Sequence, residues 1–150
     1  MRAIIQRVSG ASVTIENVKI SSIKTGLMIL LGIEQEDSEE DAQWLVRKIC
    51  SLRIFGDENG NMNHSLQDIK GEVLLVSQFT LHAKIKKGNR PSFIKAASPE
   101  IANKLYEITK QLFNTELNQN IAAGKFGAMM QVQLINDGPI TLIIDTKNKE

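Results

Sequence analysis

The chain has few of the residues that build disulfides and zinc sites. It contains one cysteine and two histidines among 150 residues. One cysteine cannot form an intramolecular disulfide, and this cysteine and histidine content is too small for a zinc site of the usual type. We therefore expect no metal and no cofactor, and a reducing cellular compartment suits the chain.

Long apolar runs and an excess of one charge are also lacking. The longest apolar run, 27–31, is far shorter than the roughly 18 residues that cross a bilayer, and Arg7 interrupts the apolar N-terminus, which disfavours a signal peptide. Eighteen basic and seventeen acidic side chains give a formal charge of +1, which excludes a globally basic surface for nucleic acid. We expect a cytoplasmic protein with no membrane and no DNA as partners.

The common catalytic signatures are absent as well. The sequence has no G-x-S-x-G elbow, no H-E-x-x-H, no Walker loop and no G-x-G-x-x-G. Cys50 falls near the end of a predicted helix, where a free cysteine is usually a small, buried and inert hydrophobe. An enzyme with this sequence would therefore use another kind of site.

Several segments have the patterns of strands. Residues 3–23 predict short antiparallel strands with a turn at Glu16-Asn17, and the apolar run 27–33 predicts a central strand buried on both faces. Residues 71–81 predict one long strand, and residues 129–135 and 140–144 predict a pair joined by a turn at 136–139.

Two helices are predicted between the strand groups. Asp37 or Ser38 can cap the first, and the second has Ser98 as its cap and Pro99 in its first helical position. Apolar residues recur at helical spacing in both segments: Ala42, Leu45, Val46 and Ile49 in the first, and Ile101, Leu105, Ile108 and Leu112 in the second. With no repeat or linker, residues 1–150 predict a single layered α/β domain that has a mixed, largely antiparallel β-sheet and two main helices.

The strand that is predicted over 71–81 carries polar residues at its exit, where catalytic side chains commonly lie. Strand alternation places Gln78, Thr80 and His82 on one face, and Ser77 and Phe79 on the other. His82 could then act as a base for Thr80, but residues two apart on a strand are about 6.6 Å apart, which is awkward for a direct hydrogen bond. A solvated strand end explains the same pattern.

The segment 81–99 is basic and contains no acidic residue. Its cations are Lys84, Lys86, Lys87, Arg90 and Lys95. Such a segment predicts either a loop that contacts phosphates or an ordinary solvated loop.

Two further segments are open to two interpretations each. Gly138-Pro139 is an ordinary turn or a cis bond with close backbone approach to a ligand, and 126–130 is a pocket lining or a buried strand entry.

Taken together, motifs along essentially the whole chain resemble the D-aminoacyl-tRNA deacylase family. The motifs occur in one order: Gln6-Arg7-Val8, Arg53-Ile-Phe55 with Met62-Asn63, Ser77-Gln-Phe-Thr-Leu81, Arg90-Pro-Ser-Phe93, Gly124-Lys-Phe126, Met130-Gln-Val132, and Asn136-Asp-Gly-Pro139 with Thr141. The resemblance implies a cytosolic homodimer that hydrolyses the ester between a D-amino acid and the terminal adenosine of tRNA, and that also removes mischarged glycine.

The resemblance also implies how substrates are selected. Gly138 and Pro139, joined by a cis bond, would enter the active site of the other subunit, and Arg7 would hold them in place. Backbone carbonyls at a fixed position would clash with an L side chain and let hydrogen pass, which rejects L-aminoacyl-tRNA.

Catalysis is implied at Ser77, Gln78, Phe79 and Thr80. Two mechanisms are open: Thr80 as a nucleophile, or backbone N–H groups near Phe79 and Thr80 that act as an oxyanion site while the 2′-OH of the adenosine assists water. The second is more economical because no base is evident for Thr80. The stretch containing Phe126, Ala128 and Met129 would line the adenosine or aminoacyl pocket, and no family role transfers to His82.

Two other functions remain possible from the residues alone. A non-catalytic RNA-binding module would use the loop with Lys84, Lys86, Lys87 and Arg90, and would bind D- and L-aminoacyl-tRNA equally without turnover. A small-molecule hydrolase or binding protein would act on D-amino acid esters without tRNA.

Overall fold

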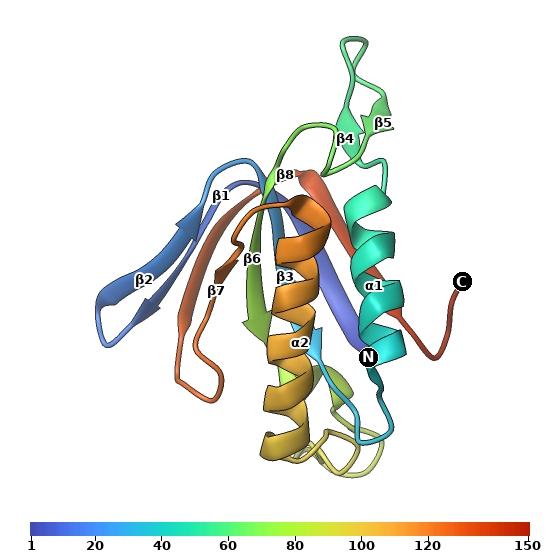
Figure 1. Ribbon diagram of the computed structural model, residues 1–150. Coiled ribbons are helices and arrows are strands. Elements are labelled where there is room, and N and C mark those ends of the chain that lie inside the picture. Colours follow the sequence, from blue (N-terminus) through green and yellow to red (C-terminus); the bar gives the residue numbers. More distant parts are fainter.

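The computed structural model describes residues 1–150 as a curved sheet with both long helices packed against the same face (Figure 1). The elements follow in the order β1 (Arg2–Ile15), β2 (Val18–Ile23), β3 (Gly26–Gly32), α1 (Glu39–Ser51), β4 (Phe55–Gly56), β5 (Met62–His64), β6 (Glu72–Ser77), the 3-10 helix η1 (Phe79–His82), α2 (Pro99–Leu117), β7 (Ala122–Ala123) and β8 (Gln131–Asp145). No helix combines the length and the apolar character that crossing a bilayer requires.

The main sheet is mixed and largely antiparallel, as the sequence predicts. Its six strands run in the order β2-β1-β3-β6-β7, and β8 pairs with β1. The pairs of β1 with β2, β3 and β8 are antiparallel, whereas β3, β6 and β7 pair in parallel. The turn at Glu16-Asn17 is confirmed, with φ of 49° and 65°, but β1 is one strand of 14 residues where short strands were predicted.

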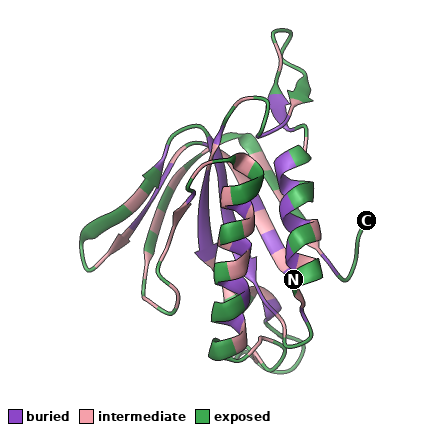
Figure 2. Cartoon of the chain, in the orientation of Figure 1, coloured by how far each residue is buried: buried purple, intermediate pink, exposed green.

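The apolar run that the sequence assigns to a central strand is β3, and this prediction is confirmed. It lies between β1 and β6, and six of its seven residues are buried. Buried residues concentrate in the central strands and on both helices (Figure 2). The larger core cluster includes residues of both helices, whereas a smaller cluster around Val8, Met28 and Leu74 contains strand residues only, which alternate with those of the larger cluster and so belong to the other face of the sheet. The side chains on both faces of the sheet centre are therefore buried.

Both helices begin where the sequence predicts. Ser38 caps α1 through a reciprocal pair of contacts with Asp41, and Pro99 starts α2 after Ser98, although the Ser98 hydroxyl makes no capping hydrogen bond. Cys50 is fully buried in α1, which confirms the expected small buried hydrophobe, and burial raises the pKa of its thiol to about 12.

Two predicted elements differ from the structure. The strand predicted over 71–81 ends at Ser77, because the chain turns into η1 after Gln78 donates its N–H to the carbonyl of Leu31 at 2.7 Å. The turn predicted at 136–139 does not separate two strands. Residues 131–145 form the single strand β8, whose two halves both pair with β1 around a bulge.

Candidate active site

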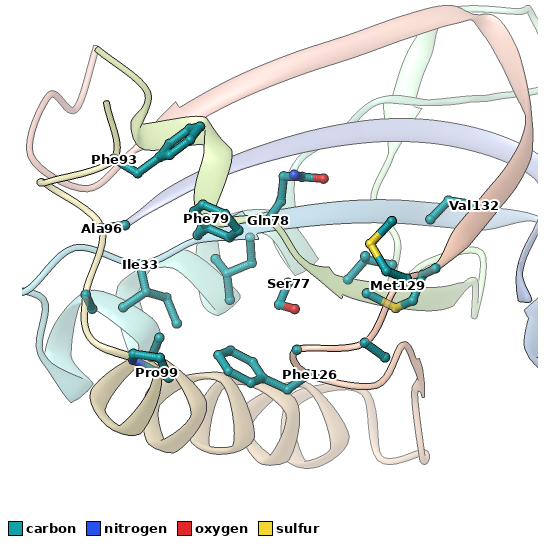
Figure 3. A pocket seen from close by; sticks show the side chains of 17 residues that line it. Ile33, Ser77, Gln78, Phe79, Phe93, Ala96, Pro99, Phe126, Met129 and Val132 are labelled. Carbon is teal, nitrogen blue, oxygen red and sulfur yellow. The ribbon is translucent and has the colours of Figure 1, made fainter. Parts of the chain in front are cut away.

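A cavity of about 640 Å³ opens where β6 ends, between η1, the start of α2 and the turn that precedes β8. Seventeen residues line it, and 13 of them are hydrophobic. Figure 3 shows Ser77 between Phe79 and Phe126, which come from different segments of the chain, with Met129 farther along the cavity. Largely apolar cavities with a few polar groups are typical of small-ligand sites.

The polar side of the cavity is the junction of β6 and η1. Ser77 is the last residue of β6 and Gln78 precedes η1; both line the cavity together with Phe79. The first N–H that closes the turn is that of Leu81, which donates to the Gln78 carbonyl at 3.3 Å. The N–H groups of Phe79 and Thr80 come before it, and the opening N–H groups of a helical turn have no partner within the turn.

Thr80 and His82 do not form the pair that strand alternation suggests, because η1 places them differently. Thr80 is exposed, lies outside the cavity lining, and accepts a hydrogen bond from the Gln78 side-chain amide. His82 is only 3% exposed and points inward. Its Nδ1 lies 2.9 Å from Oε1 of Glu34, without the alignment of a hydrogen bond, and its ring packs against Gly32.

Aromatic side chains form much of the apolar lining. Phe79 and Phe93 meet edge to face with ring centroids 5.0 Å apart. Phe126 packs at 5.8 Å from the ring of Tyr106, which is buried and donates its hydroxyl to the Leu75 carbonyl at 2.8 Å. Burial, with a smaller contribution from a nearby glutamate, raises the pKa of Tyr106, so the phenol stays a neutral hydrogen-bond donor.

The turn before β8 forms the lip of the cavity. Phe126, Ala128 and Met129 all line it, as expected for this stretch, and Met129 is 92% exposed. Gly127 has a φ of +75°, and the N–H of Ala128 donates to the carbonyl of Lys125 at 3.2 Å. This tight turn therefore places the apolar side chain of Met129 at the entrance of the cavity.

Several lining residues are not predicted as site residues by the sequence. Phe93 ends the motif Arg90-Pro-Ser-Phe93 but has no distinguishing signal of its own, and Ile33, Ala96 and Pro99 carry no local signal of a site at all. They come together because the segment after β3 and the segment before α2 pair through the N–H of Ala97 and the carbonyl of Ile33 at 2.9 Å. Only the tertiary fold reveals such a contact.

The cations of the predicted basic segment 81–99 lie outside the cavity lining, although Phe93, Ala96 and Pro99 of the same segment belong to it. Lys84 and Ser92 exchange two backbone hydrogen bonds, of 2.8 and 3.0 Å, which close the loop between them. The four proposed tRNA-contacting residues are all exposed: Lys84, Lys86, Lys87 and Arg90. Phe93 follows directly after the loop closes and lines the cavity, so the loop that carries these cations leads into the cavity lining.

Gly138 and Pro139 lie on a bulge of β8 and do not line the cavity of their own chain. The peptide bond between them is cis. In the ladder, Asn136 pairs with Val8 and Thr141 pairs with Gln6, so four residues of β8 stand opposite Arg7 alone.

Side chains from two elements hold this bulge. Arg7 donates from Nε to the Asp137 carbonyl at 2.8 Å and from a terminal nitrogen to the Ile54 carbonyl at 2.6 Å. The Asn136 amide closes the bulge from within, because it accepts from the N–H of Ile140 at 2.7 Å and donates to the Ile140 carbonyl at 3.1 Å. The structure thus brings Arg7 to Gly138-Pro139, and both lie apart from Ser77–Thr80 of the same chain.

Comparisons with known proteins agree over nearly the whole chain. Residues 4–145 match the family model described as D-Tyr-tRNA(Tyr) deacylase. The chain is 57% identical over 150 residues to a D-aminoacyl-tRNA deacylase of Bacteroides fragilis (strain YCH46), and 59% identical over 150 residues to one of Cytophaga hutchinsonii; each alignment covers all of both chains.

Two solved structures share the fold. One, titled c-Myc DNA Unwinding Element Binding Protein, superposes with a TM-score of 0.92 at 42% identity and covers 97% of this chain and 98% of its own. The other, a probable eukaryotic D-amino acid tRNA deacylase, gives a TM-score of 0.83 at 16% identity and covers 95% of this chain and 97% of its own. At that identity the second likeness concerns the fold.

Proposed function

The chain belongs to the D-Tyr-tRNA(Tyr) deacylase family, and from this membership we infer that it is a hydrolase that cleaves the ester bond of D-aminoacyl-tRNA, releasing free D-amino acid and tRNA. The structural observation that supports this most directly is the cavity at the end of β6, which places the Ser77–Thr80 segment beside an apolar space of about 640 Å³. That space suits an aminoacyl group and the base of a terminal adenosine.

We propose that the catalytic groups are the backbone N–H groups of Phe79 and Thr80. They would donate to the ester carbonyl oxygen as negative charge develops on it, and such donors commonly account for a large part of acyl-transfer catalysis. Water, oriented by the 2′-OH of the terminal ribose, would form a bond to the carbonyl carbon. The bond between the carbonyl carbon and the ribose 3′-oxygen would then break, and the 3′-oxygen would take up the proton that the attacking water loses.

A nucleophilic role for the Thr80 hydroxyl has less support. The hydroxyl already accepts from the Gln78 amide, and the nearest histidine in sequence, His82, is buried and directed away from it. A hydroxyl without an adjacent base is a weak nucleophile at neutral pH. Ser77 and Gln78 therefore act, in this proposal, by shaping the junction that presents the two amides.

We further propose that the enzyme works as a homodimer in which the bulge of one subunit enters the cavity of the other. In support, Gly138-Pro139 does not line the cavity of its own chain, and hydrogen bonds made by Arg7 and Asn136 hold the flanking backbone. The same strand exposes Ile135 and Ile143, which are 66% and 70% accessible. A rigid backbone beside the α-carbon would exclude any L side chain and admit D-amino acids and glycine.

The basic loop is proposed to contact the backbone of the tRNA. Lys84, Lys86, Lys87 and Arg90 are exposed beside the cavity, where an acceptor stem would lie when its terminal adenosine enters. Phosphate contacts of this kind weaken as salt concentration rises. This substrate also makes the cytoplasm the proposed place of action.

The proposed function is tested by mixing the purified protein with D-tyrosyl-tRNA, or with the ethyl ester of D-tyrosine, each with and without EDTA. Rapid loss of the tRNA ester alone, unchanged by EDTA, supports the proposal. Equal turnover of the small ester would instead indicate a small-molecule hydrolase. Tight tRNA binding without turnover would indicate a non-catalytic RNA-binding module.

A further inference from the structure

The C-terminal end of η1 is held by a side chain from another strand at the same end of the sheet, because Arg2 pairs with Gly32 of β3 and the neighbouring Leu31 pairs with Ser77 of β6. Arg2, the first residue of β1, donates from a terminal guanidinium nitrogen to the carbonyl of Leu81 at 2.7 Å. Leu81 is the third residue of η1, so its carbonyl lies at the end where helical turns leave acceptors unpaired. A guanidinium at that end satisfies the carbonyl and complements its partial negative charge.

The guanidinium is itself held in place by a carboxylate. Asp145 Oδ2 accepts from Nε of Arg2 at 3.0 Å and from its other terminal nitrogen at 2.9 Å. The two residues are direct partners in the ladder between β1 and β8. Although burial alone would raise the pKa of Asp145, hydrogen bonds from the Lys147 N–H and from Arg2 lower it, which keeps the carboxylate charged.

The 3-10 helix is consequently fixed at both ends. At its start, the N–H of Gln78 donates to the Leu31 carbonyl at 2.7 Å, which ties the turn to β3. At its end, Arg2 ties it to β1 and β8. The amides of Phe79 and Thr80 lie between these two anchors, and their direction depends on the orientation of a helix only four residues long.

We propose that Arg2, oriented by Asp145, is a positioning residue that aims the backbone amides of Phe79 and Thr80 at the reacting carbonyl. This inference rests on the proposed function, because it matters only if those amides stabilise the developing oxyanion. Such stabilisation is steep in geometry, since donors act best at about 2.7–3.1 Å from the oxyanion. Loosening η1 therefore lowers the rate of the chemical step more than it weakens substrate binding, because Phe79 is its only residue among the 17 that line the cavity.

The test compares Arg2→Met, Asp145→Asn and the double variant with the wild-type protein on D-tyrosyl-tRNA. We expect kcat to fall roughly tenfold in Arg2→Met with KM nearly unchanged, since misplaced catalytic groups affect the transition state more than binding. Asp145→Asn should lose less, and the double variant should be no slower than Arg2→Met, because Asp145 acts through Arg2. Arg2→Lys should recover part of the rate but not all, since lysine cannot make the same forked contact.

A second measurement reports on η1 without activity. Amide hydrogen exchange at residues 79–83 should be faster in Arg2→Met than in the wild type, while exchange in α2 should be unchanged. The matched control is Lys147→Met, which removes an ion pair with Asp41 at 3.0 Å at the same end of the fold but does not touch η1. It should show wild-type kcat and wild-type exchange at residues 79–83.

The outcomes separate the two claims. No turnover by the wild-type protein would overturn the proposed function. A wild type that is active, together with an Arg2→Met variant of equal kcat and equal exchange at 79–83, would overturn the positioning role alone. Equal loss of kcat in Arg2→Met and Lys147→Met would also overturn it, because it would indicate a general effect of stability at this end of the fold.

Discussion

Arg7 lies opposite the bulge of β8 and donates from Nε to the carbonyl of Asp137 at 2.8 Å, directly before Gly138. The same guanidinium donates to the carbonyl of Ile54, just ahead of β4, at 2.6 Å. One side chain thus joins the exposed bulge to a segment about 80 residues earlier in the chain. The position of the bulge is set by this contact as well as by the pairing of β8.

Replacing this arginine should weaken discrimination between D- and L-substrates. Arg7→Met removes both carbonyl contacts and frees the backbone that is proposed to exclude L side chains. We expect the ratio of kcat/KM for D- over L-tyrosyl-tRNA to fall at least tenfold. Arg53→Met is the matched control, because Arg53 also donates to a backbone carbonyl, that of Asn63, at 2.7 Å, but makes no hydrogen bond to the bulge. A wild-type ratio in Arg7→Met would contradict the proposed role.

A methyl group on Gly138 should disturb the same bulge from within. Gly138 has a φ of +146°, and an added Cβ would lie 2.8 Å from Cγ1 and 2.9 Å from the N–H nitrogen of Ile140. Gly138→Ala should therefore cost about 1–3 kcal/mol of unfolding free energy, measured by urea denaturation. Gly56→Ala is the control, since nothing lies within 4 Å of the position that its methyl group would take, and it should be nearly neutral. Equal stability of the two variants would show that the bulge adapts freely.

A pair of substitutions at one position separates the amide mechanism from side-chain effects. Phe79→Ala and Phe79→Pro both remove the ring, but only proline removes the N–H. Proline suits the first position of a helical turn, and Gln78, with φ of −147° and ψ of 80°, lies outside the α region that a following proline disfavours. We expect kcat to be about 100-fold lower or more in Phe79→Pro than in Phe79→Ala. Equal rates in the two variants would exclude this N–H as an oxyanion donor.

Acid should remove the stabilising contribution of Asp41, which accepts from the N–H of the cap residue Ser38 and pairs with Lys147. Burial alone would raise the pKa of Asp41, but hydrogen bonds from Lys147 and from the Ser38 N–H lower it from 3.8 to about 2. A carboxylate whose pKa is depressed in the folded state stabilises the fold above its unfolded pKa, and this contribution is lost as pH falls from about 4 to about 2.

The check is urea denaturation at several pH values for the wild type and Asp41→Asn. The advantage of the wild type should be full near pH 5 and should shrink steadily between about pH 4 and pH 2. Glu39→Gln, at an exposed neighbouring position in the first turn of α1, should run parallel to the wild type. A difference between wild type and Asp41→Asn that stays constant with pH would contradict the assignment.

Much of the fold could be read from the sequence because its signals are local. Helical spacing with Ser38 or Pro99 at the start identifies α1 and α2, and a continuous apolar run identifies the buried strand β3. The order of short motifs over the whole chain identified the family, which one motif could not do. These are the features that periodicity and end signals specify well.

The site was harder to predict because its geometry depends on contacts between distant segments. Alternation cannot distinguish the last residues of a strand from a helical turn, and the turn after Ser77 is fixed by a hydrogen bond between Gln78 and Leu31, 47 positions earlier in the chain. The bulge at Gly138 likewise looks like a hairpin turn until its two flanks are seen to pair with the same strand, β1. Neither pairing leaves a local trace in the sequence.

The most direct test of the central claim measures kcat/KM for D-tyrosyl-, L-tyrosyl- and glycyl-tRNA with the same preparation of the wild-type protein. The account predicts efficient hydrolysis of the D-ester, clear hydrolysis of the glycyl ester, and hydrolysis of the L-ester that is slower than both by at least 100-fold. Comparable rates on the D- and L-esters would contradict it, because a rigid backbone beside the α-carbon must reject an L side chain.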